Sequence, residues 1–203
     1  MTLGSRRSLV LNAALVVLFG SFAYANLLRW LQTGRPVGLG AVLLEGTAAF
    51  LFIVRRPPRE TSERLLAWLS APVGSFALLL ARPAAHPQTG PLWMYELAQL
   101  LGFALAIAGL VFLGRSFGIV AAVRGLKTSG LYAFVRHPIY TGYVIAYSGY
   151  VFENPSVRNF SLLAIGTAAQ LVRIREEERV LAHDPAYRAY SMRVRYRLLP
   201  FVY

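Results

Sequence analysis

Long apolar stretches alternate with short polar connections along almost the whole chain. A helix needs about 20 apolar residues to cross roughly 30 Å of hydrocarbon. Six stretches approach this length, at about residues 9–30, 37–54, 64–82, 92–114, 136–152 and 157–175. The pattern predicts an all-α, polytopic transmembrane helix bundle. The fifth stretch is diluted by His137, Pro138 and several tyrosines, so the count is five to six spans, with a re-entrant or interfacial helix as the alternative for the fifth.

Basic residues test this segment list, because they collect in the cytoplasmic loops of membrane proteins. They fall on alternate connections: Arg6, Arg7, Arg55, Arg56, Arg59, Arg64, Arg115, Arg124, Lys127, Arg136, Arg173, Arg175, Arg179, Arg188, Arg193, Arg195 and Arg197. Arg29, Arg35, Arg82 and Arg158 fall on the opposite side. We therefore predict an integral, multi-pass membrane protein with both termini in the cytoplasm.

The first stretch also resembles a secretory signal peptide. It has Arg6 and Arg7 before an apolar run, and an A-x-A signal at Ala23-Tyr24-Ala25. The apolar run continues to Leu31, and its removal would spoil the alternation of charge. We therefore keep it as the first span and treat residues 1–203 as a single integral membrane domain, with N-terminal transmembrane helices in 1–114 and most functional polarity in 115–203.

Composition supports a membrane protein, with 56% hydrophobic residues, 15% charged residues and a mean hydropathy of +0.50. The net charge of +12 would suggest nucleic-acid binding in a soluble protein. Here the apolar content points instead to anionic lipid headgroups at the cytoplasmic face. The chain has no cysteine, and its only histidines are His86, His137 and His183. We therefore expect no nucleic acid, no disulfide and no metal.

Two polar clusters stand out, at Gly125–Gly142 and at Arg173–Asp184. In the first, Pro138 suits the start of a helix, whose free N–H groups and dipole favour a carboxylate, and Arg136 would add to this. In the second, Arg173 and Glu177 are four residues apart and share a helix face. Both clusters begin at the same predicted membrane face, so we expect them to share one pocket.

These residues carry a resemblance to a known family. The matching run is Lys127-Thr-Ser-Gly-Leu-Tyr-Ala-Phe-Val-Arg-His-Pro-Ile-Tyr-Thr-Gly142, followed by Arg173-x-x-x-Glu177-Glu178-x-x-Leu181, Tyr187-x-x-Tyr190 and Leu199-Pro200-Phe201. It resembles the isoprenylcysteine carboxyl methyltransferase family, whose wider group includes the membrane phospholipid N-methyltransferases. The resemblance covers about residues 112–203.

The resemblance implies a methyltransferase whose C-terminal half, residues 115–203, encloses S-adenosylmethionine beneath a cytoplasmic cap. A lateral opening would admit a membrane lipid or lipidated acceptor. Glu177 would hold the methionine ammonium and Arg173 would face the acceptor, which makes these two the expected catalytic residues. The expected cofactor-binding residues are Arg124, Gly125, Leu126, Lys127, Tyr132, His137, Pro138, Ile139, Tyr140 and Glu177.

The chain departs from the family pattern in two places. Arg124 stands where eukaryotic members carry a histidine, six residues before the glycine of Gly130-x-Tyr132. The link from Leu181 to Tyr187 is about two residues shorter than usual. These differences bear more on the acceptor than on the cofactor.

Methyl transfer from a sulfonium needs alignment and a dry pocket more than a strong acid or base. A carboxylate acceptor, as in prenylated cysteine, is already nucleophilic, and Arg173 would orient it. An amine acceptor, as in phosphatidylethanolamine, must first lose a proton, which Glu176, Glu178 or a tyrosine would accept. The residues leave both acceptors open.

Each of these residues also has a structural interpretation. His137 is then a residue at the start of a helix, Tyr132 and Tyr140 are interfacial aromatics, and Glu177 forms a salt bridge with Arg173. Arg136 would then contact lipid phosphate. The C-terminal stretch from Tyr187 is either a basic helix on the membrane surface or a lid over the cofactor.

The competing class of function is a non-catalytic helical membrane protein or a small transporter. Its signature would be a path of polar residues at mid-membrane. Glu45 and Glu96 lie in or near apolar segments, where an ionisable group is costly and marks a functional candidate. Little else in the sequence fits such a path.

Overall fold

The computed structural model describes residues 3–84 and 90–200, with side chains from residue 9 onward. His86, residues 201–203 and the side chains of Arg6 and Arg7 lie outside this description. The fold is all-α, as the sequence predicts, apart from a ribbon of two short strands. In chain order the elements are α1 (Leu3–Thr33), α2 (Pro36–Val54), β1 (Glu60–Thr61), α3 (Leu65–Phe76), η1 (Ala77–Leu80), α4 (Leu92–Leu113), η2 (Gly114–Ser116), β2 (Ala122–Val123), η3 (Gly130–Ala133), α5 (Pro138–Glu153), α6 (Val157–Leu181) and α7 (Pro185–Arg193).

Local sequence explains where several helices begin. Pro36, Pro138 and Pro185 each occupy the first turn of a helix, where the missing N–H of proline costs no hydrogen bond. Ser156 caps α6 by accepting a hydrogen bond from the backbone N–H of Asn159. The first turn of α5 therefore begins at the proline that the sequence marks as a helix start.

Three helices are long and apolar enough to cross a membrane: α1 from Leu9, α2, and α4 continued to Ser116. The segment Leu65–Leu80 is apolar but shorter, and α5 spans only about 24 Å at 1.5 Å per residue. Helix α6 has 25 residues but is polar toward its C-terminus. All six predicted segments contain helix, and the count of five to six spans stays a prediction.

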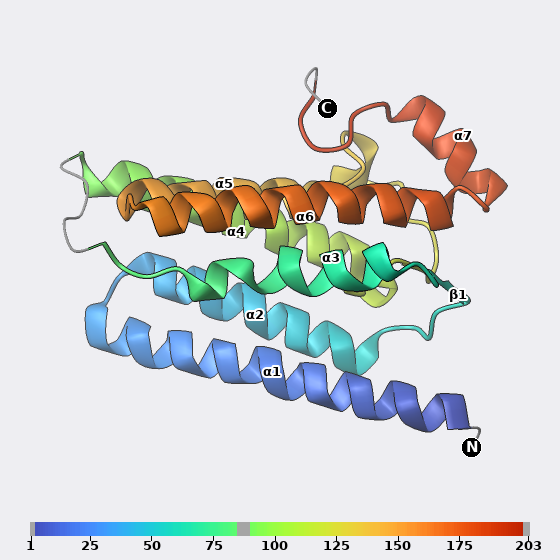
Figure 1. Cartoon of the computed structure of the whole chain (residues 1–203), viewed down its shortest axis with the longest axis horizontal. Coiled ribbons are helices and arrows are strands. Elements are labelled where there is room, and N and C mark those ends of the chain that lie inside the picture. Colours follow the sequence, from blue (N-terminus) through green and yellow to red (C-terminus); the bar gives the residue numbers. More distant parts are fainter. Residues whose placement is uncertain (1–2, 85–89, 201–203) are drawn as a thin grey trace.

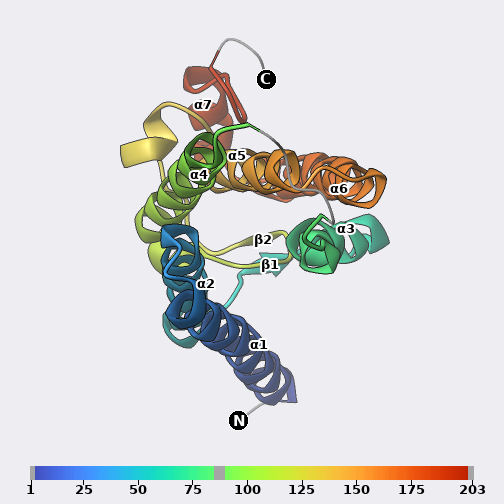
Figure 2. The same ribbon diagram turned by 90° about the vertical axis from the view of Figure 1, so that its left-hand side faces the viewer.

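The helices run side by side along the long axis of the molecule (Figure 1). Helix α1 packs on α2, α2 on α4, α4 on α5, and α3 on α6. Viewed toward one end, these helices form an open arc in which α3 lies across from α1 and α2 (Figure 2). This arrangement leaves space between the two ends of the arc, where the cavity described below is found.

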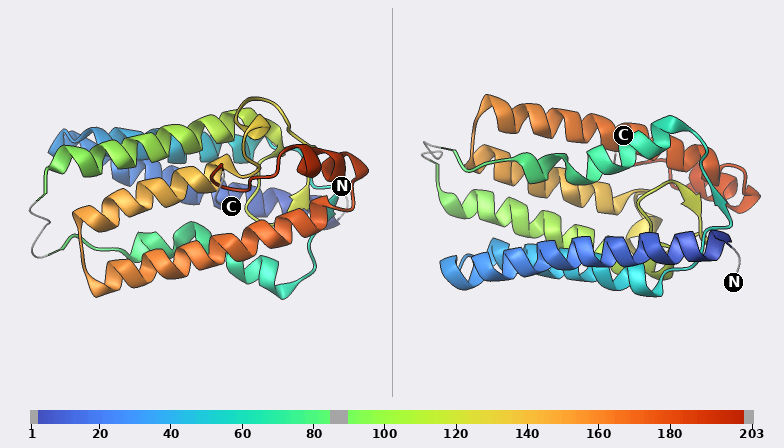
Figure 3. Two further views of the ribbon diagram at one scale, coloured as in Figure 1. Left: turned by 90° about the horizontal axis from the view of Figure 1, so that it is seen from above. Right: turned by 60° about the horizontal axis from the view of Figure 1, so that its bottom comes forward.

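The basic connections gather at one end of the bundle (Figure 3). There β1 pairs antiparallel with β2, with Glu60 opposite Val123 and Thr61 opposite Ala122. The ribbon thereby joins the connection between α2 and α3 to the connection between α4 and α5. Helix α7 lies at the same end, which agrees with the alternation of charge along the chain; which face of the membrane this end meets stays a prediction.

Glycines allow α4 and α5 to approach at backbone distance. A Cβ on Gly102 would lie 2.4 Å from the backbone nitrogen of Ala146, and a Cβ on Gly142 would lie 2.6 Å from that of Ala106. Contacts this short exclude any side chain, so small residues are required at this crossing. The contact fixes the start of α5, and with it His137 and Tyr140, relative to α4.

A polar cluster closes the opposite end of the bundle and accounts for Glu96. Arg35 lies 2.7 Å from Glu96 and 2.8 Å from Glu153, and Gln99 donates a hydrogen bond to Glu153. These contacts tie the start of α2 to α4 and to the end of α5. Glu96 therefore has an ion-pair partner and needs no functional explanation.

Candidate active site

A cavity of about 1350 Å³, counting its open mouth, lies between the two ends of the helical arc. Its walls come from α1, α2, α3, α5 and α6, from the segment 116–127 and from α7. Small-molecule sites are usually concave and largely apolar, with a few polar groups among the lining residues, and this cavity has the same character.

The sequence-predicted site residues meet at this cavity. Those that line it are Arg124, Gly125, Leu126, Lys127, Tyr132, His137, Ile139, Tyr140, Arg173 and Glu177. Pro138 is the exception, because it is fully buried in the first turn of α5 and lines no part of the cavity. The two polar clusters are thus brought together as expected, while the roles of their residues stay predictions.

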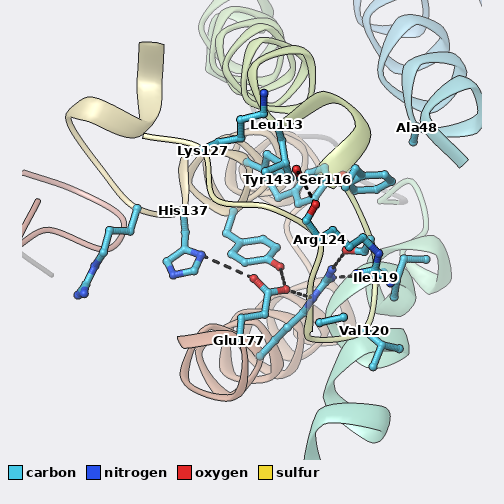
Figure 4. A pocket seen from close by; sticks show the side chains of 18 of the residues that line it. Ala48, Leu113, Ser116, Ile119, Val120, Arg124, Lys127, His137, Tyr143 and Glu177 are labelled. Atoms are coloured by element: carbon cyan, nitrogen blue, oxygen red, sulfur yellow. Dashed lines mark hydrogen bonds and ion pairs between the residues drawn. The ribbon is translucent and has the colours of Figure 1, made fainter. Parts of the chain in front are cut away.

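Glu177 is the centre of the polar network in the cavity (Figure 4). Its carboxylate accepts a hydrogen bond of 2.5 Å from the Tyr140 hydroxyl and one of 3.2 Å from Nε of Arg173. Nδ1 of His137 lies 3.8 Å from its other oxygen. The ring of His137 is stacked on that of Tyr140, with centroids 5.6 Å apart. A carboxylate at a cavity wall, with its orientation fixed by neighbours, suits the binding of an ammonium group.

Glu178 faces the other way and holds the C-terminal segment. Its carboxylate lies 2.8 Å from Nε of Arg197, 3.2 Å from Nε of Arg136 and 3.3 Å from Nε2 of His137. Burial alone would raise the pKa of Glu178, but hydrogen bonds from His137 and Arg197 and the nearby positive charges lower it to about 2. Glu178 is therefore a poor proton acceptor. Glu176 is held by Arg64 and Arg179, and neither Glu176 nor Glu178 lines the cavity.

The C-terminal segment also occupies the N–H groups that precede α5. The backbone N–H of Arg136 donates to the carbonyl of Tyr196, and that of His137 donates to the carbonyl of Arg197. The sequence predicts that this helix start suits a carboxylate, with Arg136 in support. The two N–H groups just before the helix are already bonded to the chain's own carbonyls, and Arg136 lies beside Glu178.

Arg173 is almost fully buried, and each of its three guanidinium nitrogens donates to a protein group. Besides Glu177, the acceptors are the hydroxyl of Ser75 at 3.0 Å and the carbonyl of Gly118 at 3.1 Å. The guanidinium also lies over the ring of Tyr140, 5.0 Å from its centroid. These contacts join α3, α6 and the segment 116–127, so Arg173 organises the wall of the cavity.

Arg124 contrasts with Arg173, because it is 8% exposed and its side chain makes no hydrogen bond or ion pair within the described part of the chain. Its guanidinium lies over the backbone of Gly118, where a Cβ would come within 2.5 Å of Nη1. Burial and the charge of Arg55 lower the pKa of Arg124 to about 10, with Glu177 opposing the change. The cavity therefore contains a buried cation that has no partner among the residues that the structure describes.

Tyr132 is held inside the protein. It is 7% exposed, and its hydroxyl donates to the carbonyl of Gly109 while its own carbonyl accepts from Tyr190. Burial and the nearby Glu177 raise the pKa of Tyr132 well above its usual value. Its turn needs Gly130, which has a φ of +62° and on which a Cβ would lie 2.4 Å from the ring of Phe112. Tyr132 therefore belongs to the cavity wall and does not face lipid.

The cavity also includes residues that sequence reasoning did not assign. They include Phe19, Phe22, Leu44, Glu45, Ala48, Ser75, Phe76, Leu79, Tyr143 and Tyr147. Most of these come from the first 80 residues, which carry none of the motifs quoted for the family. The one signal available was Glu45, an acid in the middle of an apolar segment, which accepts a hydrogen bond of 3.0 Å from Asn26.

The fold and the cavity define a helical membrane protein with a cavity between its helices that has both polar and apolar walls. Residues 98–187 match the family model for phospholipid methyltransferases. The matched segment contains the Tyr140, Arg173 and Glu177 network and most of α4. The match confirms the resemblance to the membrane methyltransferases, and methyl transfer to a lipid is the activity it supports. No curated protein matches the chain.

Proposed function

We propose that the chain transfers a methyl group from S-adenosylmethionine to a lipid acceptor inside this cavity. The observation that carries the proposal is the network around Glu177, which lies in the family-matched segment and lines the cavity. The cofactor would supply a methyl group bonded to a positively charged sulfur. The protein would supply position and a dry environment.

The residues present fit this cofactor. Glu177 has lone pairs left to accept hydrogen bonds from an ammonium group, and Tyr140, Arg173 and His137 hold it in place. Gly125, Leu126 and Lys127 form a wall of the same cavity, and Lys127 is an exposed cation suited to a carboxylate. Tyr132 and Ile139 provide apolar and aromatic surface beside them.

The acceptor that the geometry favours is the amine of a phospholipid, with carboxyl O-methylation of a prenylated cysteine as the second candidate. In the carboxyl reaction Arg173 would orient the acceptor, but Arg173 is almost fully buried and is already paired with Glu177. An amine must lose a proton before it attacks. His137 lines the cavity, and histidine is the side chain that most often acts as a general base, whereas Glu176 and Glu178 lie outside the cavity.

Titration of the purified protein with S-adenosylmethionine tests the cofactor assignment. We expect Glu177→Ala and His137→Ala to weaken binding at least about tenfold, since each removes a contact of a charged ligand. Glu176→Gln is the matched control, because it removes the adjacent acid outside the cavity, and its affinity should stay within about twofold of wild type. Unchanged affinity in both site variants would remove the assignment.

Transfer of a labelled methyl group to defined lipids tests the reaction. Phosphatidylethanolamine and a prenylated cysteine, offered separately in the same detergent, distinguish the two acceptors. We expect label in the phospholipid. Cofactor binding without label in either lipid would contradict both acceptors, and absence of cofactor binding would favour the non-catalytic class.

A further inference from the structure

We infer that the side chain of Arg124 binds the phosphate of a phospholipid acceptor. This inference rests on the proposed function, and it assigns a specificity residue on the acceptor side of the cavity. Arg124 stands where eukaryotic members of the resembling family carry a histidine, so the family pattern does not supply this role.

The first argument is the cost of leaving this group unpaired. Arg124 is 8% exposed, its Nε is buried without a hydrogen-bond partner, and no carboxylate lies within ion-pair distance among the described residues. A buried charge is strongly unfavourable unless it is paired and hydrogen-bonded. Arg173, equally buried, shows the usual solution, with three protein acceptors. An anionic ligand would do the same for Arg124.

The second argument is the charge of the cavity wall. Arg173 is paired with Glu177, and Arg136 lies beside Glu178, which leaves Lys127 and Arg124 as the lining cations without a partner among the described residues. The cofactor carries one carboxylate, and its ammonium and sulfonium groups give it a net positive charge. If that carboxylate pairs with Lys127, as proposed above, no anionic group of the cofactor is left for Arg124. The buried Arg124 then requires a second anion, because water cannot solvate it as it solvates the exposed Lys127.

The third argument is position. The guanidinium of Arg124 lies on Gly118, whose carbonyl accepts from Arg173, so the unpaired cation is next to the Glu177 network (Figure 4). Arg56 lies near the same segment, where a Cβ on Gly125 would be 3.6 Å from its Nη1. The planar guanidinium matches a phosphate with two parallel hydrogen bonds. A phosphodiester held here would keep its headgroup amine close to the proposed reacting centre.

Direct lipid binding tests the inference without relying on turnover. The probes are phosphatidylmethanol, which has a phosphodiester but no amine, and diacylglycerol with the same acyl chains, which has no phosphate. We expect wild type to prefer phosphatidylmethanol, and Arg124→Gln to lose about tenfold or more of that preference. Arg115→Gln removes a charge from an exposed position on the same segment and should keep the preference.

Gly118→Ala provides a second route to the same result. The added Cβ would meet only the mobile end of Arg124, so the guanidinium would be displaced at little cost in stability. We expect the preference for phosphate to fall, with no further loss in the double variant with Arg124→Gln. Thermal unfolding of Arg124→Gln without ligand should be no lower than that of wild type, because the substitution removes an unpaired buried charge.

Three results would overturn the inference. One is a preference for phosphatidylmethanol that survives in both Arg124→Gln and Gly118→Ala. Another is a loss of S-adenosylmethionine affinity in Arg124→Gln with lipid preference unchanged, since the anion would then be the cofactor carboxylate. In the third result, Arg124→Gln weakens the binding of oleate but leaves the binding of phosphatidylmethanol unchanged. If the wild-type protein does not bind the cofactor or does not transfer a methyl group, the proposed function is wrong. The lipid-binding measurements can still be interpreted in that case.

Discussion

At the scale of single residues, the hydroxyl of Tyr140 gives a direct test of how Glu177 is held. Tyr140→Phe keeps the ring under Arg173 and beside His137 but removes the 2.5 Å hydrogen bond to the carboxylate. A hydrogen bond to a charged group contributes about 1.5–3 kcal/mol, so cofactor affinity should fall about tenfold or more. Calorimetric titration measures this. Tyr150→Phe, near the far end of the same helix, should bind like wild type, and equal affinity in both variants would contradict the assignment.

The carboxylate of Glu178 predicts a pH dependence of stability. The pKa of Glu178 is lowered from 4.5 to about 2 in the folded protein. Its ionised carboxylate therefore contributes fully to the free energy of unfolding above about pH 4.5, and this contribution is lost as pH falls toward 2. Glu178→Gln should therefore lower the free energy of unfolding at pH 7 by up to about 3 kcal/mol. The difference in stability between Glu178→Gln and wild type should disappear as the pH is lowered. Thermal unfolding in detergent from pH 7 to pH 3 measures this, and a constant gap would refute it.

At the scale of elements, the crossing of α4 and α5 depends on residues without side chains. Gly142→Ala places a Cβ 2.6 Å from the backbone nitrogen of Ala106, which cannot move as a side chain would. We expect a loss of about 1–3 kcal/mol of stability together with weaker cofactor binding, since α5 carries His137 and Tyr140. Gly46→Ala, at a helix glycine with nothing within 4 Å, is the control and should be neutral or slightly stabilising. Equal melting temperatures in the two variants would show that the crossing tolerates a side chain.

Sequence alone predicts the helices better than it predicts their roles. Apolar stretches and prolines at helix starts give the order and approximate bounds of the elements, because both are local properties. The proximity of Tyr140 and Glu177 can be predicted from the sequence motif and from the alternation of charge along the chain. Ser75, Gly118 and Tyr143 carry no such signal, since they reach the cavity only through the packing of α3, of segment 116–127 and of α5. The unpaired state of Arg124 is likewise visible only once its surroundings are known.

At the scale of the whole molecule, the two ends of the bundle are chemically different. One end collects the basic connections, the strand ribbon, α7 and the cavity residues Lys127 and His137, whereas the other is closed by the contacts of Arg35 with Glu96 and Glu153. This asymmetry follows from the alternation of charge along the chain. It requires that the polar wall of the cavity lie on the same side as the basic loops.

The orientation of this asymmetry in the membrane gives the last prediction. Because the chain has no cysteine, single cysteines report position without background. Ser129 and Ala189 are exposed residues at the basic end, and Gln32 is an exposed residue at the other end. The three variants are Ser129→Cys, Ala189→Cys and Gln32→Cys. In intact cells a membrane-impermeant thiol reagent should label only Gln32→Cys, and permeabilisation should expose the other two. Labelling of Ser129→Cys from outside would place the polar wall of the cavity on the outer face, and would remove the cytoplasmic site on which the cofactor assignment depends.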